Sequence, residues 1–407
     1  MAQTRYSYTL VAISLAAQLS NAQAEIMIQP EVSTRAFYDN NPRLRIDPAT
    51  EVAATVNEIV AETVYARPTY SVVLTPKFRL SRYTEDTELD SEDYFVKLEG
   101  LKSMEKSQLA GEFNYEREAS FTTEQTDSDR LNINVPRTTF SANSSWLYSL
   151  SEKSYVTFFG NALDVSFEDP PPLTLIDYLQ FGAGTSISHA ISDRTTLNAT
   201  LSVSQFKTPQ IGSKTLSYIY QFGFEYQFDE TLSTSFRIGN NISHLDFKST
   251  QTQLISLVPL RFSTSIVDGS GRSSGEIINL TVVKDLDRAT LGLEWDRSFS
   301  PSSQGSRRRS QRVYGYGRYD FSRSFDGILQ VTYRESAQER SGILLRADQR
   351  ETLDIRGTLR YDISKIWRAE LGLRYREIKR ANGATKSDSQ RVFLTLRYSP
   401  DKFNYKP

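Results

Sequence analysis

The chain has no cysteine and only two histidines among its 407 residues. The lack of cysteine excludes disulfide bonds, thiolate metal sites, a cysteine nucleophile and the acylated cysteine of a lipoprotein. Beyond the N-terminus no stretch approaches the roughly 20 apolar residues of a transmembrane helix, and the mean hydropathy is −0.46. Motifs of nucleotide-binding loops, zinc peptidases and nucleophile-elbow serine hydrolases are also absent. We therefore expect no cofactor, no metal site and no helical membrane bundle.

What the chain has instead is a hairpin pattern that recurs along most of its length. The clearest copy runs from Leu216 to Ile242, with apolar and polar residues alternating on both sides of a turn at Asp229-Glu230. Successive side chains of a strand point to opposite faces, so this hairpin has one apolar and one polar face. The pattern predicts the all-β class, as a transmembrane up-and-down antiparallel β-barrel with lipid outside and water or polar side chains inside. A soluble β-sandwich or β-helix is the alternative, and it would need many more buried aliphatic residues.

The N-terminus indicates export from the cytoplasm. Residues 1–24 combine Arg5, an apolar core from Tyr8 to Leu19 and an Ala22-Gln23-Ala24 cleavage site, the pattern of a signal peptide. We expect a mature protein from Glu25, a barrel over residues 25–399 and a short periplasmic tail over residues 399–407. The expected location is the outer membrane of a Gram-negative bacterium, in contact with its lipids and lipopolysaccharide. Nucleic acid is not an expected partner.

Sixteen strands can be placed from Tyr70 onward. They read approximately 69–83, 92–103, 107–120, 135–149, 153–167, 177–190, 195–207, 214–228, 231–244, 274–286, 288–299, 309–322, 325–337, 349–362, 366–379 and 388–399. Segments 28–38 and 56–65 can add another hairpin, which gives 18 strands, the alternative being 16 strands plus an N-terminal arm. Short turns should face the periplasm and long loops the outside. Within the longest predicted loop, 245–273, residues 253–266 would form a short extra strand or fold into the mouth as a constriction.

The polar face of the last third of the chain is rich in charge. The residues that we expect to line the lumen are Arg318, Arg334, Arg356, Arg360, Arg368, Arg374, Arg376, Arg391, Arg397, Glu294, Asp296 and Glu370. The leucine-rich positions between them should face lipid, because an Arg or Lys on the lipid face near the midplane costs about 2–4 kcal/mol. Residues 288–397 hold 23 Lys and Arg against 13 Asp and Glu, whereas residues 1–287 hold 23 against 35. One arc of the wall should therefore be basic and another more acidic.

Two functions fit such a wall. The first is a pore for polar or anionic solutes such as acidic sugars, because opposed charge arcs can steer anions. The second is a non-conducting structural or assembly barrel, whose lumen is closed by a network of Arg, Glu and Asp. The run Arg307-Arg308-Arg309 would contact phosphorylated lipid or stay solvated. Phe158-Phe159 is interpreted as part of an aromatic girdle, although aromatic residues in a lumen can also form a sugar-stacking path.

We do not expect an enzyme, and no catalytic residue is predicted. An outer-membrane hydrolase is a third hypothesis, for which His244 with Asp246 and Ser243 is the only local candidate. Serine and aspartate are common in loops, so chance proximity is the favoured explanation of this group.

Three sequence phrases carry a family resemblance. They are Ile28-Gln29-Pro30-Glu31-Val32 with Tyr38-Asp39-Asn40-Asn41, the turn phrases Tyr148-Ser149-Leu150-Ser151 and Tyr361-Asp362-Ile363-Ser364, and the closing strand from Val392 to Tyr398. On these the chain resembles the β-barrel porin 2 group and related outer-membrane barrels encoded with exopolysaccharide or exosortase systems. The resemblance implies passage or display of polysaccharide, together with periplasmic export partners, and carries over no catalytic residues. The chain departs from such barrels in the nine residues that follow Tyr398, since a closing strand usually ends in an aromatic residue.

Overall fold

The computed structural model describes most of the chain. The described residues are 25–46, 49–127, 134–170, 175–257, 260–301, 307–340, 343–344, 349–380 and 386–405. The predicted signal peptide lies outside them. None of the helices in these ranges has the length and apolar character of a membrane span.

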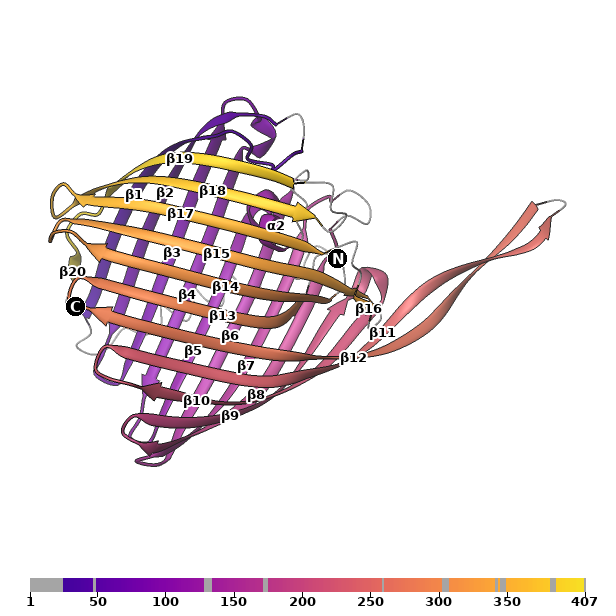
Figure 1. The fold of residues 1–407 in the computed structure, drawn as a ribbon, viewed down its shortest axis with the longest axis horizontal. Coiled ribbons are helices and arrows are strands. Elements are labelled where there is room, and N and C mark those ends of the chain that lie inside the picture. The colour runs from indigo at the N-terminus through magenta and orange to yellow at the C-terminus, as the bar shows by residue number, and fades with distance from the viewer. Residues whose placement is uncertain are drawn as a thin grey trace.

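Eighteen antiparallel strands form one closed up-and-down β-barrel (Figure 1). They are β1(Glu25–Asp39), β2(Val52–Ala66), β3(Tyr70–Tyr83), β4(Ser91–Ser103), β5(Ser107–Ala119), β6(Pro136–Ser151), β7(Ser154–Phe167), β8(Tyr178–Ser192), β9(Thr195–Thr208), β10(Ser213–Gln227), β11(Leu232–Leu257), β12(Leu260–Leu286), β13(Ala289–Pro301), β14(Arg307–Asp320), β15(Phe325–Arg340), β17(Arg350–Asp362), β18(Trp367–Arg380) and β19(Lys386–Tyr398). The barrel closes where β1 pairs with β19, Val32 lying opposite Tyr398 and Asp39 opposite Arg391. The 18-strand prediction is confirmed, and the alternative of a separate N-terminal arm is wrong, because β1 and β2 are part of the wall.

Short and long connections lie at opposite ends of the barrel, which we call the turn end and the loop end. The short turns and the C-terminus share the turn end, whereas the helix α2(Ser120–Asp127) lies at the loop end (Figure 1). Two 3₁₀ turns, η1(Thr87–Leu89) and η2(Pro209–Ile211), are also part of long connections. Outer-membrane barrels place their short turns in the periplasm, which assigns the loop end to the outside.

The prediction of a long loop over residues 245–273 is wrong. The strands β11 and β12 stay paired from Leu232 opposite Lys284 to Leu257 opposite Leu260. Their pairing with the neighbouring strands ends earlier, at Asp246 on β11 and at Ile278 on β12. The hairpin therefore continues beyond the barrel wall and projects away from it, rather than closing the mouth (Figure 1).

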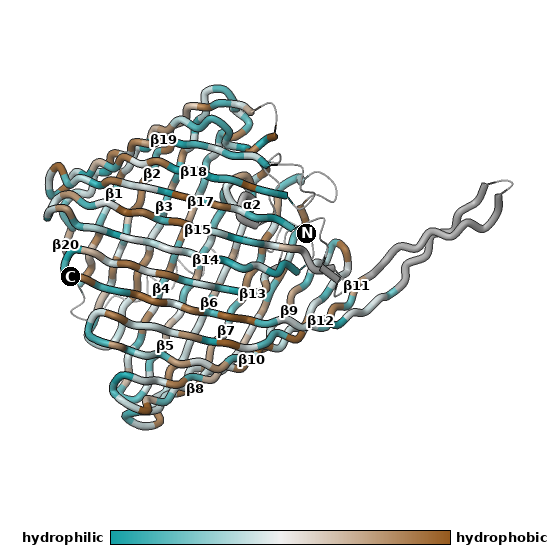
Figure 2. The backbone as a smooth tube through the Cα atoms, in the orientation of Figure 1, coloured by the Kyte–Doolittle hydropathy of each residue, from teal (hydrophilic) through white to brown (hydrophobic). Residues whose placement is uncertain are grey.

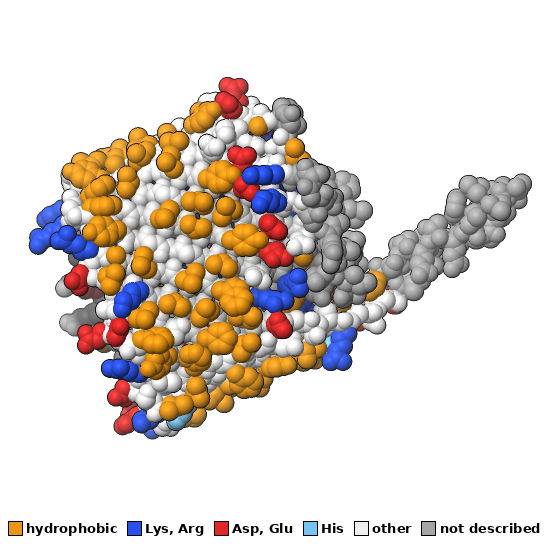
Figure 3. Space-filling model, in the orientation of Figure 1, with side chains coloured by type: hydrophobic (Ala, Val, Ile, Leu, Met, Phe, Trp, Pro, Cys, Tyr) orange, Lys and Arg blue, Asp and Glu red, His pale blue; other side chains and the backbone are white. Residues whose placement is uncertain are grey.

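The outer face of the barrel is apolar. Apolar and polar residues alternate along the strands (Figure 2), and on the face shown in Figure 3 the apolar side chains cover the middle of the barrel while charged ones gather near its two ends. Outward side chains such as Leu201, Leu329, Leu373 and Leu394 are 54–62% exposed. A closed barrel with an apolar belt on its outer face is suited to a lipid bilayer, and the protein is an outer-membrane protein.

The residues after Tyr398 extend the seam of the barrel. The short strand β20(Phe403–Tyr405) pairs with residues 26–28 of β1, next to the stretch that β19 covers. A second short strand, β16(Ile343–Leu344), pairs with the loop end of β15. The segment predicted as a tail therefore includes a strand that pairs with the barrel.

Candidate functional site

The twelve charged residues predicted to line the lumen all lie on the inner face of the barrel. They belong to β13, β14, β15, β17, β18 and β19, and they alternate with exposed outward residues such as Leu293, Leu359 and Leu371. The strand register keeps them on one face: Arg360 lies opposite Glu370, and Arg374 opposite Arg391. The strands β14 to β19 thus form a basic sector of the inner wall.

Most arginines of the basic sector are neutralised by carboxylates. The pairs are Arg312–Glu294 (3.1 Å), Arg360–Asp326 (2.5 Å), Arg368–Asp362 (2.6 Å), Arg374–Asp354 (2.5 Å), Arg391–Asp39 (2.9 Å) and Arg397–Glu31 (2.6 Å). Each of them joins two neighbouring strands. These ion pairs run along the wall and brace it, so they are not the cross-lumen network that a closed barrel would require.

Two arginines of the inner wall differ from the others. The guanidinium carbons of Arg35 and Arg356 lie 5.3 and 5.0 Å from the centre of the Phe393 ring. Arg35 on β1 also donates a hydrogen bond from Nε to Oγ1 of Thr395 (2.9 Å). Since β1 and β17 lie on either side of the pair β18–β19, the two groups approach the ring from two directions. We call Arg35, Phe393 and Arg356 the arginine clip.

Among the described residues, no carboxylate forms an ion pair with either arginine of the clip. In the described ranges, no Asp or Glu oxygen lies within 4.0 Å of a guanidinium nitrogen of Arg35 or Arg356. At longer range, Glu58 and Glu370 act on Arg35, and Glu370 and Asp354 act on Arg356. Glu58 is bound by Arg79 at 2.7 Å, and Asp354 by Arg374 at 2.5 Å. Both clip arginines are half-buried in the wall. Their guanidinium groups therefore keep N–H donors that no carboxylate of the described residues accepts.

The ring of the clip is fixed by a glycine on the neighbouring strand. Phe393 lies opposite Gly372 of β18, and a methyl group at Gly372 would overlap the ring. The missing side chain lets the ring lie against the wall instead of standing in the lumen. Only 3% of Phe393 is exposed, so the ring is a rigid support for both arginines.

The rest of the inner wall divides into two further sectors. The acidic sector is formed by inward residues of β4 and β5, namely Asp93, Glu99, Glu112, Glu116 and Glu118, with Lys97 among them. The neutral sector extends over β6 to β11 and presents mainly Ser, Thr, Asn and Gln, including Ser141, Asn143, Asn161, Thr200, Ser202, Ser217 and Gln221. The predicted basic and acidic arcs are both present, and a wide arc with few charged side chains, among them the ion pair of Glu225 and Arg237, separates them on one side.

Sequence reasoning missed Arg35 and the neutral sector. Arg35 lies far from the arginine-rich last third of the chain, but barrel closure places β1 beside β19. Alternation in residues 28–38 combined with closure would have assigned Arg35 to the basic sector. The net negative charge of residues 1–287 hides the neutral sector, because many of the acidic residues that contribute to this charge lie in turns and loops and not in the wall.

The residues of the hydrolase hypothesis are split between the two faces. Ser243 points inward and contacts the hydroxyl of Ser217 at 2.7 Å. His244 points outward, where its ring meets that of Tyr218 at 6.3 Å. Asp246 has the same parity as His244, so the three side chains form no serine–histidine pair. In the described segments no cluster of three or more His, Asp or Glu is arranged to hold a metal ion.

The arginine run at the start of β14 is not simply solvated. The Arg307 guanidinium lies 3.7 Å from the centre of the Phe299 ring and donates hydrogen bonds to the hydroxyls of Ser243 and Ser273. Arg308 is 5% exposed. The interpretation of a solvated or lipid-bound run is therefore wrong for these two residues.

At the loop end a packed cluster lies on the rim between β3 and β18. Leu44, Leu89, Phe121 and Ile378 are buried together. Arg43 binds both carboxylate oxygens of Asp86 (2.5 and 2.7 Å), and this hydrogen bonding raises the pKa of Arg43. The connection between β1 and β2 is thus held against the rim by a buried ion pair and an apolar contact.

The chain was also compared with known proteins. No protein-family model matches it, and no curated protein matches it either. Among solved structures, OccAB4 of Acinetobacter baumannii aligns with a TM-score of 0.46 and 9% identity, covering 94% of this chain and 99% of the other. The outer membrane protein OpdK of Pseudomonas aeruginosa gives 0.43 and 11%, with 93% and 99% covered. A bacterial polysaccharide outer membrane secretin gives 0.34 and 8%, with 91% and 98% covered. At these scores the likeness carries no argument about function, and the resemblance to the β-barrel porin 2 group stays a prediction.

Proposed function

We propose that the barrel is an outer-membrane channel that passes polar anionic solutes, with acidic saccharides as the substrate class. The arginine clip is the observation that carries this proposal. Its two guanidinium groups face a lumen in which the neighbouring arginines already have carboxylate partners. An anion that enters the lumen meets donors there that the protein itself does not satisfy.

The dimensions and the chemistry of the wall support an open lumen. Barrels of about 16–18 strands leave an aqueous channel once their side chains are placed. The ion pairs of the basic sector lie along the wall, which leaves the centre free of them. The serine- and asparagine-rich neutral sector offers hydroxyl and amide groups, which suit a solute that carries both hydroxyl groups and charge.

The resemblance to barrels encoded with exopolysaccharide systems supports the choice of saccharide. In that role the channel would transport an acidic polysaccharide, or fragments of one, between the periplasm and the outside, with export proteins as periplasmic partners. The twelve charged residues identified from the sequence would line its path, with Arg356 in direct contact with the solute. No side chain is assigned a catalytic role.

Single-channel recording of the refolded protein in a planar bilayer tests the proposal. Under a KCl gradient we expect steady open steps and a reversal potential that is displaced from zero toward the equilibrium potential of chloride. Silence from protein shown to be folded would contradict the channel and favour a structural barrel. Open steps with cation preference would contradict the role of the clip.

A further inference from the structure

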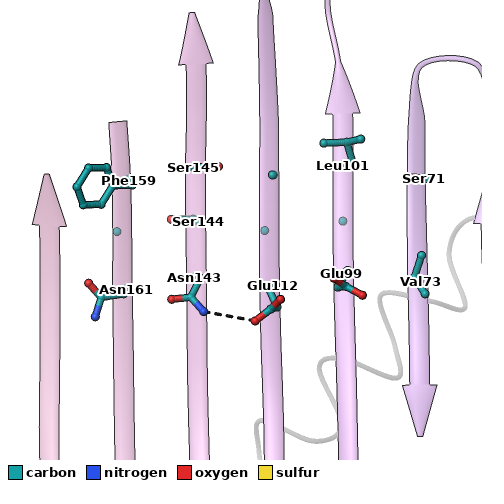
Figure 4. A pocket seen from close by; sticks show the side chains of 14 residues that line it. Ser71, Val73, Glu99, Leu101, Glu112, Asn143, Ser144, Ser145, Phe159 and Asn161 are labelled. Carbon is teal, nitrogen blue, oxygen red and sulfur yellow. Dashed lines mark hydrogen bonds between the residues drawn. The ribbon is translucent and has the colours of Figure 1, made fainter. Parts of the chain in front are cut away.

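The inner wall contains a recess away from the arginine clip. It occupies about 630 Å³ where β3 to β7 pass through the turn-end half of the barrel (Figure 4). Two neighbouring rows of inward side chains form it. One row runs Glu99, Glu112, Asn143 and Asn161, and the other runs Leu101, Ala110, Ser145 and Phe159, each residue lying opposite the next.

The hollow results from the choice of residues in the second row. Ala110 and Ser145 are small, so the wall between the two ends of this row is hollowed. Larger side chains, Leu101 and Phe159, stand at the two ends of this row. A volume of this size is within the range of about 300–1,000 Å³ that is typical of small-molecule sites.

Phe159 presents the face of its ring to the lumen. Its side chain leans over Gly184 of β8, where a methyl group would overlap the ring. In Figure 4 the ring is seen face-on at the edge of the recess, pointing toward the next strand. The preceding residue, Phe158, is on the lipid face, 46% exposed and stacked on Trp146. The girdle interpretation thus holds for Phe158 and is wrong for Phe159.

The polar row offers hydrogen bonds and keeps one excess negative charge. Lys97 lies 2.9 Å from Glu99 and 3.4 Å from Glu112, so it neutralises one of the two carboxylates. Glu112 also accepts hydrogen bonds from Asn114 (2.8 Å) and Asn143 (3.5 Å), which fix its orientation. For the described residues, the side chains of Asn161 and Ser145 have no hydrogen-bond partner in the protein.

We infer that this recess binds one uncharged pyranose unit of a saccharide. The C–H face of a sugar ring packs on an aromatic face, and the amides, hydroxyl and carboxylates of the recess suit its hydroxyl groups. The inference rests on the proposed function only in that a saccharide must reach the lumen. It adds a site for uncharged rings on the wall between the acidic and neutral sectors, separate from the anion site of the clip.

Calorimetric titration of the refolded barrel tests the inference without requiring conduction. The probes are neutral hexasaccharides of α-1,4-glucose, β-1,4-glucose and β-1,4-mannose, and the detergent is an amine oxide, because a sugar detergent would compete. We expect at least one of the probes to bind. Phe159→Leu should weaken that binding about tenfold, the equivalent of 1.4 kcal/mol, while still covering Gly184. Phe158→Leu, a change to the adjacent lipid-facing residue, should leave the affinity unchanged.

A second variant separates a binding role from a structural one. Asn161→Ala removes an amide that makes no hydrogen bond to the described protein, so we expect a folded barrel with affinity reduced about fivefold. Failure of all three probes to bind would overturn the inference, as would equal affinities of the wild type, Phe159→Leu and Asn161→Ala. Binding without conduction would contradict the channel and retain the recess, whereas conduction without binding would do the opposite.

Discussion

Removing one arginine of the clip should lower anion selectivity more than removing a complete ion pair. An anion held by the clip would lie about 4 Å from each guanidinium, where two unit charges interact by about 1 kcal/mol even at the dielectric constant of water. Salt screens such a short contact only partly, because the Debye length is about 10 Å at 0.1 M. The variant Arg356→Gln should therefore reduce the chloride-to-potassium permeability ratio about fivefold. Arg35→Gln should act in the same direction and by a similar amount.

The matched control is the double variant Arg360→Gln, Asp326→Asn. Arg360 is on the same strand as Arg356, and Asp326 is on the neighbouring strand β15. The double variant removes a pair whose nitrogen and oxygen lie 2.5 Å apart, so it leaves the net charge of the wall unchanged. We expect its permeability ratio to stay within about twofold of the wild type. The measurement is the reversal potential in planar bilayers under a tenfold KCl gradient. If Arg356→Gln and the double variant give equal reversal potentials, the clip is not the source of selectivity.

Three further predictions concern the barrel itself. Gly372→Ala should destabilise it by about 1–3 kcal/mol in urea unfolding from vesicles, because the added methyl group overlaps the ring of Phe393. Gly357→Ala should change the stability little in the same assay, because its methyl group would meet nothing within 4 Å. Leu201→Arg should lower the free energy of unfolding by about 2–4 kcal/mol in the same assay, since this side chain is 60% exposed on the lipid face. Ser202→Arg should lower it much less, because residue 202 points into the lumen. Equal losses for the two variants would contradict the assignment of faces. Hydrogen bonds from the Thr231 hydroxyl and from backbone amides lower the pKa of the Asp229 carboxyl in its turn, so its stabilising effect is complete above about pH 4 and is lost as the pH falls toward that lowered pKa. Asp229→Ala should accordingly lower the unfolding midpoint at pH 7 and have a smaller effect at pH 2; an equal effect at both would contradict this.

The wall of the barrel could be predicted because one physical constraint acts on almost every strand residue. A charge on the lipid face is costly, so alternation alone placed Arg360, Arg374 and Arg397 inward and Leu371 outward. The turns could be predicted as well, since Asp229 begins a tight connection in which its carboxylate accepts hydrogen bonds from the backbone N–H groups of Thr231 and Leu232. These features depend on neighbours in the sequence.

What sequence reasoning missed depends on contacts between distant segments. The clip joins Arg35 to Phe393 and Arg356, which only the closure of the barrel brings together. The recess requires a register in which Ala110 lies opposite Ser145, and no local pattern specifies it. The residues after 244 have no strong alternation, so the sequence does not predict their continued pairing in the long hairpin.

The pairing at the closure of the barrel, between β1 and the C-terminal residues, also depends on contacts between distant segments. The segment that follows Tyr398 is too short and too polar to predict as part of a wall. Its pairing becomes evident only when β1 is known to extend past the end of β19, leaving residues 26–28 available for β20.

The measurement that tests the channel most directly is swelling of proteoliposomes in solutions of a sugar and its matching acid, such as galactose and sodium galacturonate. The two solutes have nearly the same size, so a difference in swelling rate reports the charge preference of the lumen. We predict that both enter, that the acid enters faster, and that Arg356→Gln removes most of this difference. Proteoliposomes that hold folded barrel and swell in neither solute, or that swell faster in galactose, would contradict an open channel for anionic solutes.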